Sequence, residues 1–149
     1  MPTLPELYQE VILDHNRRPR HYGRLPAPTH TAQGHNPLCG DRLSMTLRIA
    51  DGRLAEVAFE GAGCAIAKAS ASLLTDALLG HTTDEALTLI EAFHAALTTP
   101  PEQPIDEDRL GKLAALVGVR VFPVRIKCAS LAPHTLRAAI TGTQEASTE

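Results

Sequence analysis

An alternating stretch, followed directly by an Asp-Gly pair, constrains the fold more than any other feature of this sequence. In residues 41–50 apolar side chains alternate with polar ones, which is the period-two pattern of a half-buried β-strand. The apolar positions are Leu43, Met45, Leu47 and Ile49. Asp51-Gly52 is a strong signal for a two-residue hairpin turn. Residues 53–60 are predicted to form the returning strand, whose buried face would carry Ala55, Val57 and Phe59.

Helical patterns account for most of the remaining chain. The spacing of apolar residues predicts helices over residues 3–16, 64–79, 82–97, 107–117 and 130–140. Thr82 and Glu85 form a capping-box pattern at the start of the third of these helices. A strand is predicted near residues 30–36, at the sheet edge. Residues 118–128, interrupted by Pro123, are predicted as extended, and residues 143–149 as a frayed tail. We therefore predict a single α+β domain over residues 1–149, in which a small antiparallel sheet of about three strands has helices packed on one face.

Composition and charge exclude several classes of function. The chain has 149 residues, is 44% hydrophobic and carries a net charge of −3, so it offers no basic surface for nucleic acid or an anionic membrane. No apolar run approaches the length of a membrane span. The first residues include acidic side chains and lack the basic start and apolar core of a signal peptide. We therefore expect a cytoplasmic protein that binds neither nucleic acid nor membrane.

Three cysteines, each near the end of a predicted element, indicate a metal site. Three thiols cannot all pair within one chain, and a reducing compartment keeps them free. Cys39 and Asp41 flank Gly40 ahead of the strand and, as residues i and i+2 of an extended segment, would point the same way. Cys64 begins a predicted helix, where the N-terminus stabilises a thiolate. Cys128 precedes the last predicted helix, so the four side chains can converge at one end of the sheet.

Thiolate sulfurs with one carboxylate oxygen are suitable ligands for tetrahedral zinc, and thiolates also hold iron–sulfur clusters. These residues alone do not decide between the two cofactors. Lys68, Arg125 and Lys127 are second candidates, because their charges can offset the excess negative charge of such a site. In an extended segment Arg125 and Lys127 would point away from Cys128, so a solvated face explains them equally well. The alternative for the thiols is that they are small buried core residues.

Four stretches of the sequence resemble the U-type iron–sulfur cluster assembly proteins, the family of SufU, IscU and the N-terminal domain of NifU. The stretches are LYQEVILDHNRRPRHYG, NPLCGD, FEGAGCAIAKASASLLTDALLG and RIKCASLAPHTL. The resemblance extends from Leu4 to Ile140 and implies a SufE/NifU-like α+β fold with cysteines clustered at one end. It also implies that the protein receives sulfur from a pyridoxal-phosphate cysteine desulfurase and helps to build clusters for recipient apoproteins.

Two features resemble SufU more than IscU. Lys127 stands directly before the last cysteine, where IscU-like proteins have histidine, and residues 97–116 occupy the place of an insertion found in SufU-like proteins. The resemblance therefore implies a zinc ion held by Cys39, Asp41, Cys64 and Cys128. One departure is Pro133-His134, where a bulky aromatic residue is common in the family. This departure does not involve the implied ligands.

We assign Cys39 the role of sulfur acceptor. It is predicted in a glycine-adjacent loop and can move, whereas Cys64 and Cys128 are predicted at helix starts. Its thiolate would attack the terminal sulfur of the desulfurase persulfide. Asp41, a weaker zinc donor than a thiolate, would keep the metal labile. On this hypothesis the protein is a zinc-dependent sulfurtransferase. Two alternatives stay open: a scaffold for a transient [2Fe–2S] cluster, and a binding module whose zinc is purely structural.

Overall fold

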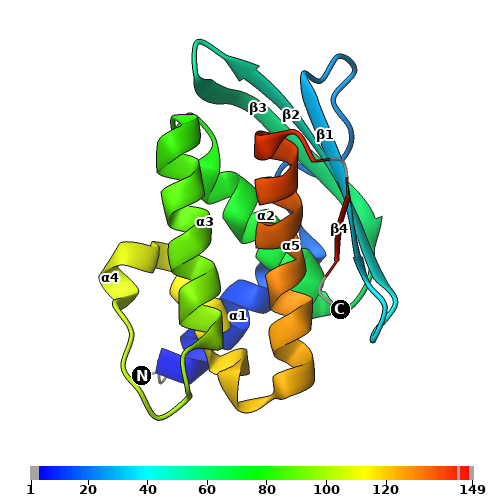
Figure 1. Cartoon of the computed structure of the whole chain (residues 1–149). Helices are drawn as coiled ribbons and strands as arrows, with labels where there is room; N and C mark the ends of the chain where they lie inside the picture. The colour runs from blue at the N-terminus through cyan, green and yellow to red at the C-terminus, as the bar shows by residue number, and fades with distance from the viewer. Residues whose placement is uncertain (1–3, 144, 148–149) are drawn as a thin grey trace.

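The predicted β-hairpin is present and lies within a four-stranded sheet in the computed structural model, which describes residues 4–143 and 145–147 (Figure 1). The strands are β1 (His30–Asn36), β2 (Asp41–Ala50), β3 (Arg53–Ala62) and β4 (Glu145–Ser147), in the spatial order β3-β2-β1-β4. Asp51 and Gly52 have φ values of 53° and 72°, the left-handed conformation that this type of two-residue turn requires. The predicted inward face of β2 is confirmed for Leu43, Met45 and Leu47, which are all buried.

The prediction for β3 is wrong at one residue, because the strand contains a β-bulge. Arg48 pairs with Glu56 and Ile49 pairs with Leu54, so Ala55 is the extra residue. As a result Leu54 is 0% exposed, while Ala55 is exposed instead of sharing the buried face of Val57. Beyond the bulge, Val57 and Phe59 face inward as predicted.

The sheet is larger and less regular than predicted. Residues 143–149 were expected to fray, but Glu145–Ser147 form β4, which pairs parallel with β1. The sheet is therefore mixed, and β1 lies between two strands instead of at the edge. Residues 144 and 148–149 of the predicted tail lie outside the described residues.

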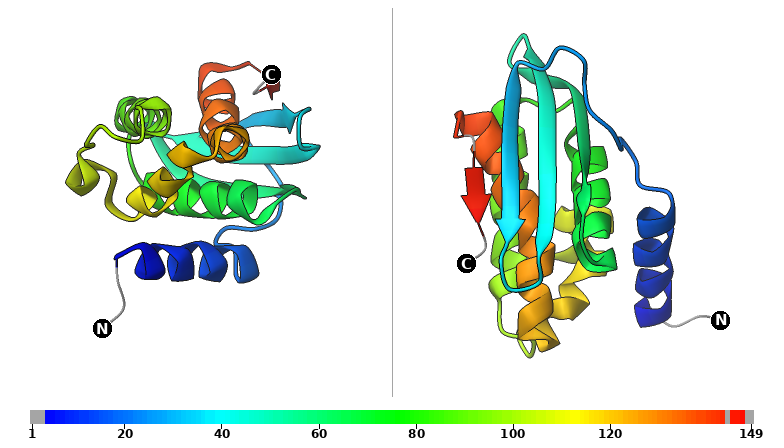
Figure 2. Two further views of the ribbon diagram at one scale, coloured as in Figure 1. Left: turned by 90° about the horizontal axis from the view of Figure 1, so that it is seen from below. Right: turned by 90° about the vertical axis from the view of Figure 1, so that its right-hand side faces the viewer.

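Helices cover one face of the sheet, as predicted (Figure 2). The helical segments are α1 (Leu4–Arg17), α2 (Ala65–Leu78), α3 (Thr83–Thr98), α4 (Glu107–Leu110), the 3-10 segment η1 (Gly111–Val121) and α5 (Pro123–Thr141). α2 and α5 pack directly against the strands, α3 packs on α5, and α1 packs on α2 and η1. The predicted capping box of Thr82 and Glu85 opens α3. Within the described residues, no helix has both the length and the apolarity needed to cross a membrane.

The last helix begins earlier than predicted. Residues 118–128 were expected to be extended, with the helix starting at residue 130, but α5 starts at Pro123 and contains Cys128 within its second turn. Pro123 occupies the first helical position, where the missing N–H costs nothing, so it starts the helix instead of interrupting a strand. The valine-rich run before it forms the end of η1.

A second proline lies inside α5, and a side chain of α2 supplies the hydrogen bond that this proline cannot make. Pro133 has no N–H, so it cannot bond the carbonyl of Ala129 one turn earlier. The Ser70 hydroxyl of α2 donates to that carbonyl instead, at 2.7 Å, and both residues are buried. This bond fastens the two helices that cover the sheet.

Candidate metal centre

Cys39 lies in the turn that connects β1 to β2. Residues 37–40 form this turn, and the Gly40 N–H donates to the carbonyl of Asn36 at 2.8 Å while Gly40 adopts a φ of 75°. Cys39 and Asp41 are predicted to lie in one extended segment. This prediction is wrong, because only Asp41 belongs to the strand. The turn nevertheless brings the Cys39 sulfur, on an exposed residue, back over the end of the sheet.

Asp41 is the first residue of β2 and is only 1% exposed. Both of its carboxylate oxygens have partners. Oδ1 accepts the backbone N–H of Cys64 at 3.0 Å, and Oδ2 accepts the side-chain amide of Asn36 at 3.2 Å. Gly63, which directly precedes Cys64, lies so close to the carboxylate that an added Cβ would be 2.6 Å from Oδ1. The carboxylate is therefore fixed in a narrow space with Oδ2 facing the thiols.

Cys64 is the N-cap of α2, as predicted. Its sulfur accepts the backbone N–H of Ala67 at 3.5 Å and lies 4.0 Å from Asp41 Oδ2. At this position the sulfur lies beside the unpaired backbone amides of the first helical turn.

Cys128 supplies the buried side of the cluster from α5 and is 0% exposed. Its sulfur lies 3.7 Å from the sulfur of Cys39. The pKa of the Cys128 thiol is raised far above its ordinary value, first by burial and then by hydrogen bonds to Cys64 and Asp41 and the charge of Cys64. A cation placed among these groups would reverse that effect and stabilise the thiolate.

The structure brings together all four residues that the sequence singled out as ligands. Ligand atoms of Cys39, Asp41 and Cys128 lie within 4.8 Å of one another, and Cys64 adjoins this group through Asp41. Two sulfurs bound to one tetrahedral zinc ion are about 3.8 Å apart, as follows from the usual zinc–sulfur bond length. The separation of 3.7 Å between Cys39 and Cys128 is of this size. Cys39, Asp41 and Cys128 therefore have the chemistry and the spacing to share one metal ion, and Cys64 lies outside this group of three but next to Asp41.

Of the three second candidates, Arg125 lies beside the thiols. It precedes Cys128 by three residues in α5, so the two share a side of the helix, contrary to the expectation from an extended segment. Hydrogen bonding to Cys128 and the charges of Cys64 and Cys128 raise the pKa of the Arg125 guanidinium. Lys68 instead lies over the ring of Tyr22, with Nζ 5.6 Å from the ring centroid. Lys127 is half-buried.

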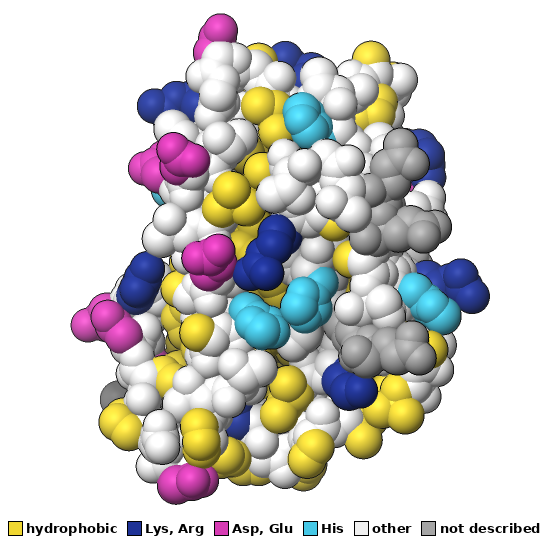
Figure 3. Space-filling view, in the orientation of Figure 1, with side chains coloured by type: hydrophobic (Ala, Val, Ile, Leu, Met, Phe, Trp, Pro, Cys, Tyr) yellow, Lys and Arg dark blue, Asp and Glu magenta, His cyan; other side chains and the backbone are white. Residues whose placement is uncertain are grey.

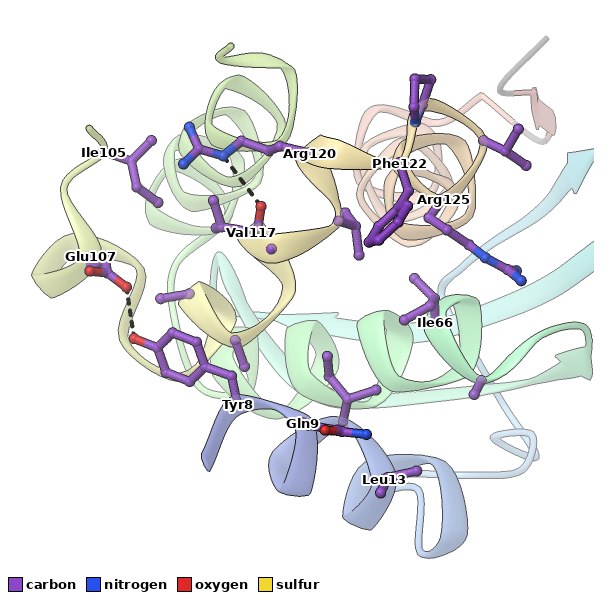
Figure 4. A pocket seen from close by; sticks show the side chains of 18 of the residues that line it. Tyr8, Gln9, Leu13, Ile66, Ile105, Glu107, Val117, Arg120, Phe122 and Arg125 are labelled. Atoms are coloured by element: carbon purple, nitrogen blue, oxygen red, sulfur yellow. Dashed lines mark hydrogen bonds between the residues drawn. The ribbon is translucent and has the colours of Figure 1, made fainter. Parts of the chain in front are cut away.

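Cys39 also borders a large apolar groove between α1, η1, α2 and the start of α5 (Figure 4). Its volume is about 1190 Å³. Phe122 points into it toward Ile66 of α2, and at the far end the Tyr8 hydroxyl donates to Glu107 at 2.7 Å. The acceptor candidate therefore lies where a partner surface can reach it.

The departure at Pro133-His134 lies away from this centre. His134 contacts His94 of α3, with ring centroids 4.8 Å apart. Figure 3 shows two histidine side chains side by side on the face of the molecule that is turned to the viewer. Burial lowers the pKa of both imidazoles. Sequence reasoning did not identify Asn36 or Gly63 as parts of the centre, although NPLCGD and GAGC place both beside predicted ligands.

Comparison with known proteins gives consistent matches. Residues 7–129 match the family described as NifU-like N terminal domain. The iron–sulfur cluster assembly scaffold protein IscU of Streptococcus pyogenes is 39% identical over 140 residues, which are 94% of this chain and 86% of that protein. The zinc-dependent sulfurtransferase SufU of Bacillus subtilis is 41% identical over 130 residues, 87% of this chain and 86% of that protein.

Solved structures agree with the fold. A protein of Fervidobacterium islandicum, assigned as an iron–sulfur cluster assembly scaffold for the SUF system, superposes with a TM-score of 0.82 at 28% identity, covering 93% of this chain and 99% of that chain. A NifU-like N-terminal protein of Brucella abortus gives 0.80 at 26% identity, covering 90% and 92%. The predicted α+β fold of the NifU type is confirmed.

Proposed function

Because the chain belongs to the NifU-like N-terminal domain family, we propose that it is an iron–sulfur cluster assembly protein that accepts sulfur from a cysteine desulfurase. Cys39, Asp41, Cys64 and Cys128 hold one zinc ion in this proposal. The observation that carries it is the convergence of three thiols and one buried carboxylate from separate elements of the chain. The relative named a zinc-dependent sulfurtransferase, 41% identical, supports zinc and sulfur transfer as the chemistry of such a site.

A zinc ion bound there would keep the thiols deprotonated near neutral pH and protect them from oxidation. Three thiolates, one carboxylate and a dication leave the site with an excess of negative charge. The Arg125 guanidinium, which interacts with Cys128 and Cys64, offsets part of this excess. Arg125 also lines the groove next to Cys39, where an incoming anionic sulfur would pass.

Cys39 is the sulfur acceptor, because it is the exposed thiol and lies in a turn instead of a helix. Its thiolate attacks the terminal sulfur of a persulfide on the desulfurase cysteine. A new S–S bond forms on Cys39, the S–S bond of the desulfurase breaks, and the desulfurase cysteine leaves as a thiolate. No net oxidation occurs, since one persulfide replaces another. Cys64 and Cys128, held by helices α2 and α5, stay in place during this exchange.

The groove beside Cys39 is where we place the desulfurase. Leu38, Val121, Phe122 and Val124 are large apolar side chains that are 49–61% exposed. Phe122 and Val124 line the groove, and Leu38 precedes Cys39 in the turn. A partner that covers these side chains would bring its own cysteine to Cys39. The free thiols suit a reducing compartment, and we place the reaction in the cytoplasm.

A cluster scaffold is the second candidate, and the relative named an IscU scaffold, 39% identical, favours it. The two functions differ in the cofactor that the same four side chains hold. A scaffold yields a brown protein with sulfur-to-iron charge-transfer absorption after anaerobic reconstitution with iron and sulfide. A zinc-dependent sulfur acceptor is purified colourless, with zinc.

The proposal is tested by desulfurase turnover with cysteine and a thiol reductant, measured as alanine and sulfide, with and without the zinc-loaded protein. We expect stimulation by the wild type and none by Cys39→Ser. Ser44→Ala, on the opposite face of β2, serves as the control and should stimulate fully. After one turnover without reductant, mass spectrometry should find one additional sulfur on Cys39. If Cys39→Ser stimulates as well as the wild type, Cys39 is not the acceptor.

A further inference from the structure

Asn36 is a fully buried polar residue that touches two of the proposed ligands. It is the last residue of β1, is 0% exposed, and pairs across the strands with Asp41. Its side-chain Nδ2 donates to Asp41 Oδ2 at 3.2 Å and approaches the sulfur of Cys128 at 3.8 Å. A single amide group therefore reaches both a strand ligand and a helix ligand.

The orientation of this amide is unusual for a structural asparagine. Its carbonyl oxygen Oδ1 is buried without a hydrogen-bond partner among the described residues. Turning the amide over would place that oxygen against the Asp41 carboxylate and the Cys128 sulfur, and it would remove both donors from them. The observed orientation thus leaves an acceptor unpaired so that the N–H groups face the anionic centre. This is the arrangement expected when the charge of the site determines the rotamer.

The two oxygens of Asp41 are consequently fixed from opposite sides. Oδ1 is held by the backbone N–H of Cys64, and Oδ2 is held by Asn36. With Gly63 packed against the carboxylate, the side chain has little room to turn, and Oδ2 is the oxygen next to the Cys64 sulfur. Removing Asn36 frees Oδ2 and removes the polar contact with Cys128.

We propose that Asn36 is a positioning residue of the metal centre: its amide orients Asp41 Oδ2 toward the metal and donates to the sulfur of Cys128. This inference rests on the proposed function, because it assumes the four-ligand centre. Residues that orient metal ligands through hydrogen bonds typically change metal affinity by about 10- to 100-fold when they are mutated. Asn36 acts through Asp41 and Cys128 and does not itself bind the metal.

The test compares Asn36→Leu, which keeps the approximate shape without the donors, with Thr75→Val. Thr75 is also buried and polar, but it lies eleven residues beyond Cys64 along α2, and its hydroxyl donates to the carbonyls of Ala71 and Ser72 in its own helix. Zinc affinity is measured by competition with a chromophoric chelator, and the ligand geometry is read from the absorption bands of the cobalt(II)-substituted protein. Asn36→Leu should bind zinc about 10- to 100-fold more weakly and shift the cobalt bands. Thr75→Val should change neither.

A double-mutant cycle separates positioning from a general structural role. In the Asp41→Ala background, Asn36→Leu should lose most of its effect on zinc affinity, because its main acceptor is gone. An undiminished effect in that background, or wild-type affinity and cobalt bands in Asn36→Leu, would overturn the inference. If Asn36→Leu does not fold, Asn36→Ala is judged by the same criteria.

The outcomes distinguish this inference from the proposed function. If the wild type binds no zinc, the four-ligand centre itself fails. If the wild type binds zinc and transfers sulfur while Asn36→Leu matches its affinity and spectrum, only the role of Asn36 is wrong.

Discussion

Gly63 leaves no room for a side chain beside Asp41, and Gly63→Ala is therefore a sharp test of the geometry of the proposed centre. The added Cβ would lie 2.6 Å from Asp41 Oδ1, 3.0 Å from Cγ and 3.1 Å from Cβ of the same side chain. The φ of Gly63 lies outside the left-handed region, so alanine introduces no backbone strain. The carboxylate must move, and its bond with the N–H of Cys64, 3.0 Å long, must lengthen or break.

The expected magnitude follows from that bond. A hydrogen bond to a charged group contributes about 1.5–3 kcal/mol. Since each 1.4 kcal/mol is a factor of ten, losing it from the metal-bound state weakens zinc binding by about 10- to 150-fold. The assay is competition with a chelator at fixed pH. The matched control is Gly118→Ala, where an added Cβ meets nothing within 4 Å, and it should bind zinc as the wild type does. Equal zinc affinity in Gly63→Ala and Gly118→Ala would refute the reasoning.

Three further predictions concern stability and the carboxylate ligand. Ser70→Ala should lower the free energy of unfolding by about 1–3 kcal/mol in chemical denaturation, because it leaves the Ala129 carbonyl buried and unpaired. The loss should shrink in the Pro133→Ala background, where the restored N–H can serve that carbonyl. An equal loss in both backgrounds would contradict this account. Asp41→Ala should weaken zinc binding by more than about 10-fold in the chelator assay. Unchanged affinity would remove Asp41 from the ligand set. Burial lowers the pKa of His15, His94 and His134. Their neutral forms are favoured in the folded state, so the unfolded chain binds more protons once the pH falls below about 6.5. The metal-free protein should therefore lose stability from about pH 6.5 downward, and His15→Asn should reduce that slope. A slope unchanged by His15→Asn would show that His15 does not contribute.

The local signals of the sequence predicted the hairpin and the capped helix α3 well. Alternation in β2, the Asp51-Gly52 turn and the Thr82–Glu85 capping box are each determined by neighbouring residues. Features set by cross-strand register escaped prediction. The bulge at Ala55 depends on how β2 and β3 pair, and the pairing of β4 joins residues far apart in the chain.

The start of α5 was missed for a different reason. A valine-rich stretch around Pro123 has no clear helical period, and proline is compatible both with a break and with a helix start. This error also reversed the predicted direction of Arg125, which in a helix lies on the side of Cys128.

The candidate ligands were identifiable from the sequence because thiolates and carboxylates are common metal ligands. Their supporting residues were not. Gly63 takes part through its close approach to Asp41, and Asn36 takes part through contacts with Asp41 and Cys128. Their places in NPLCGD and GAGC do not by themselves mark them as parts of the centre, so only the folded arrangement identifies their contacts.

The central claim is that Cys39, Asp41, Cys64 and Cys128 bind one metal ion together. X-ray absorption at the zinc edge of the freshly purified protein tests it most directly, because it counts the atoms bound to the metal. The account predicts one zinc ion per chain surrounded by three sulfurs, one for each cysteine, and one oxygen. Zinc bound only to oxygen and nitrogen, or to a single sulfur, would contradict it.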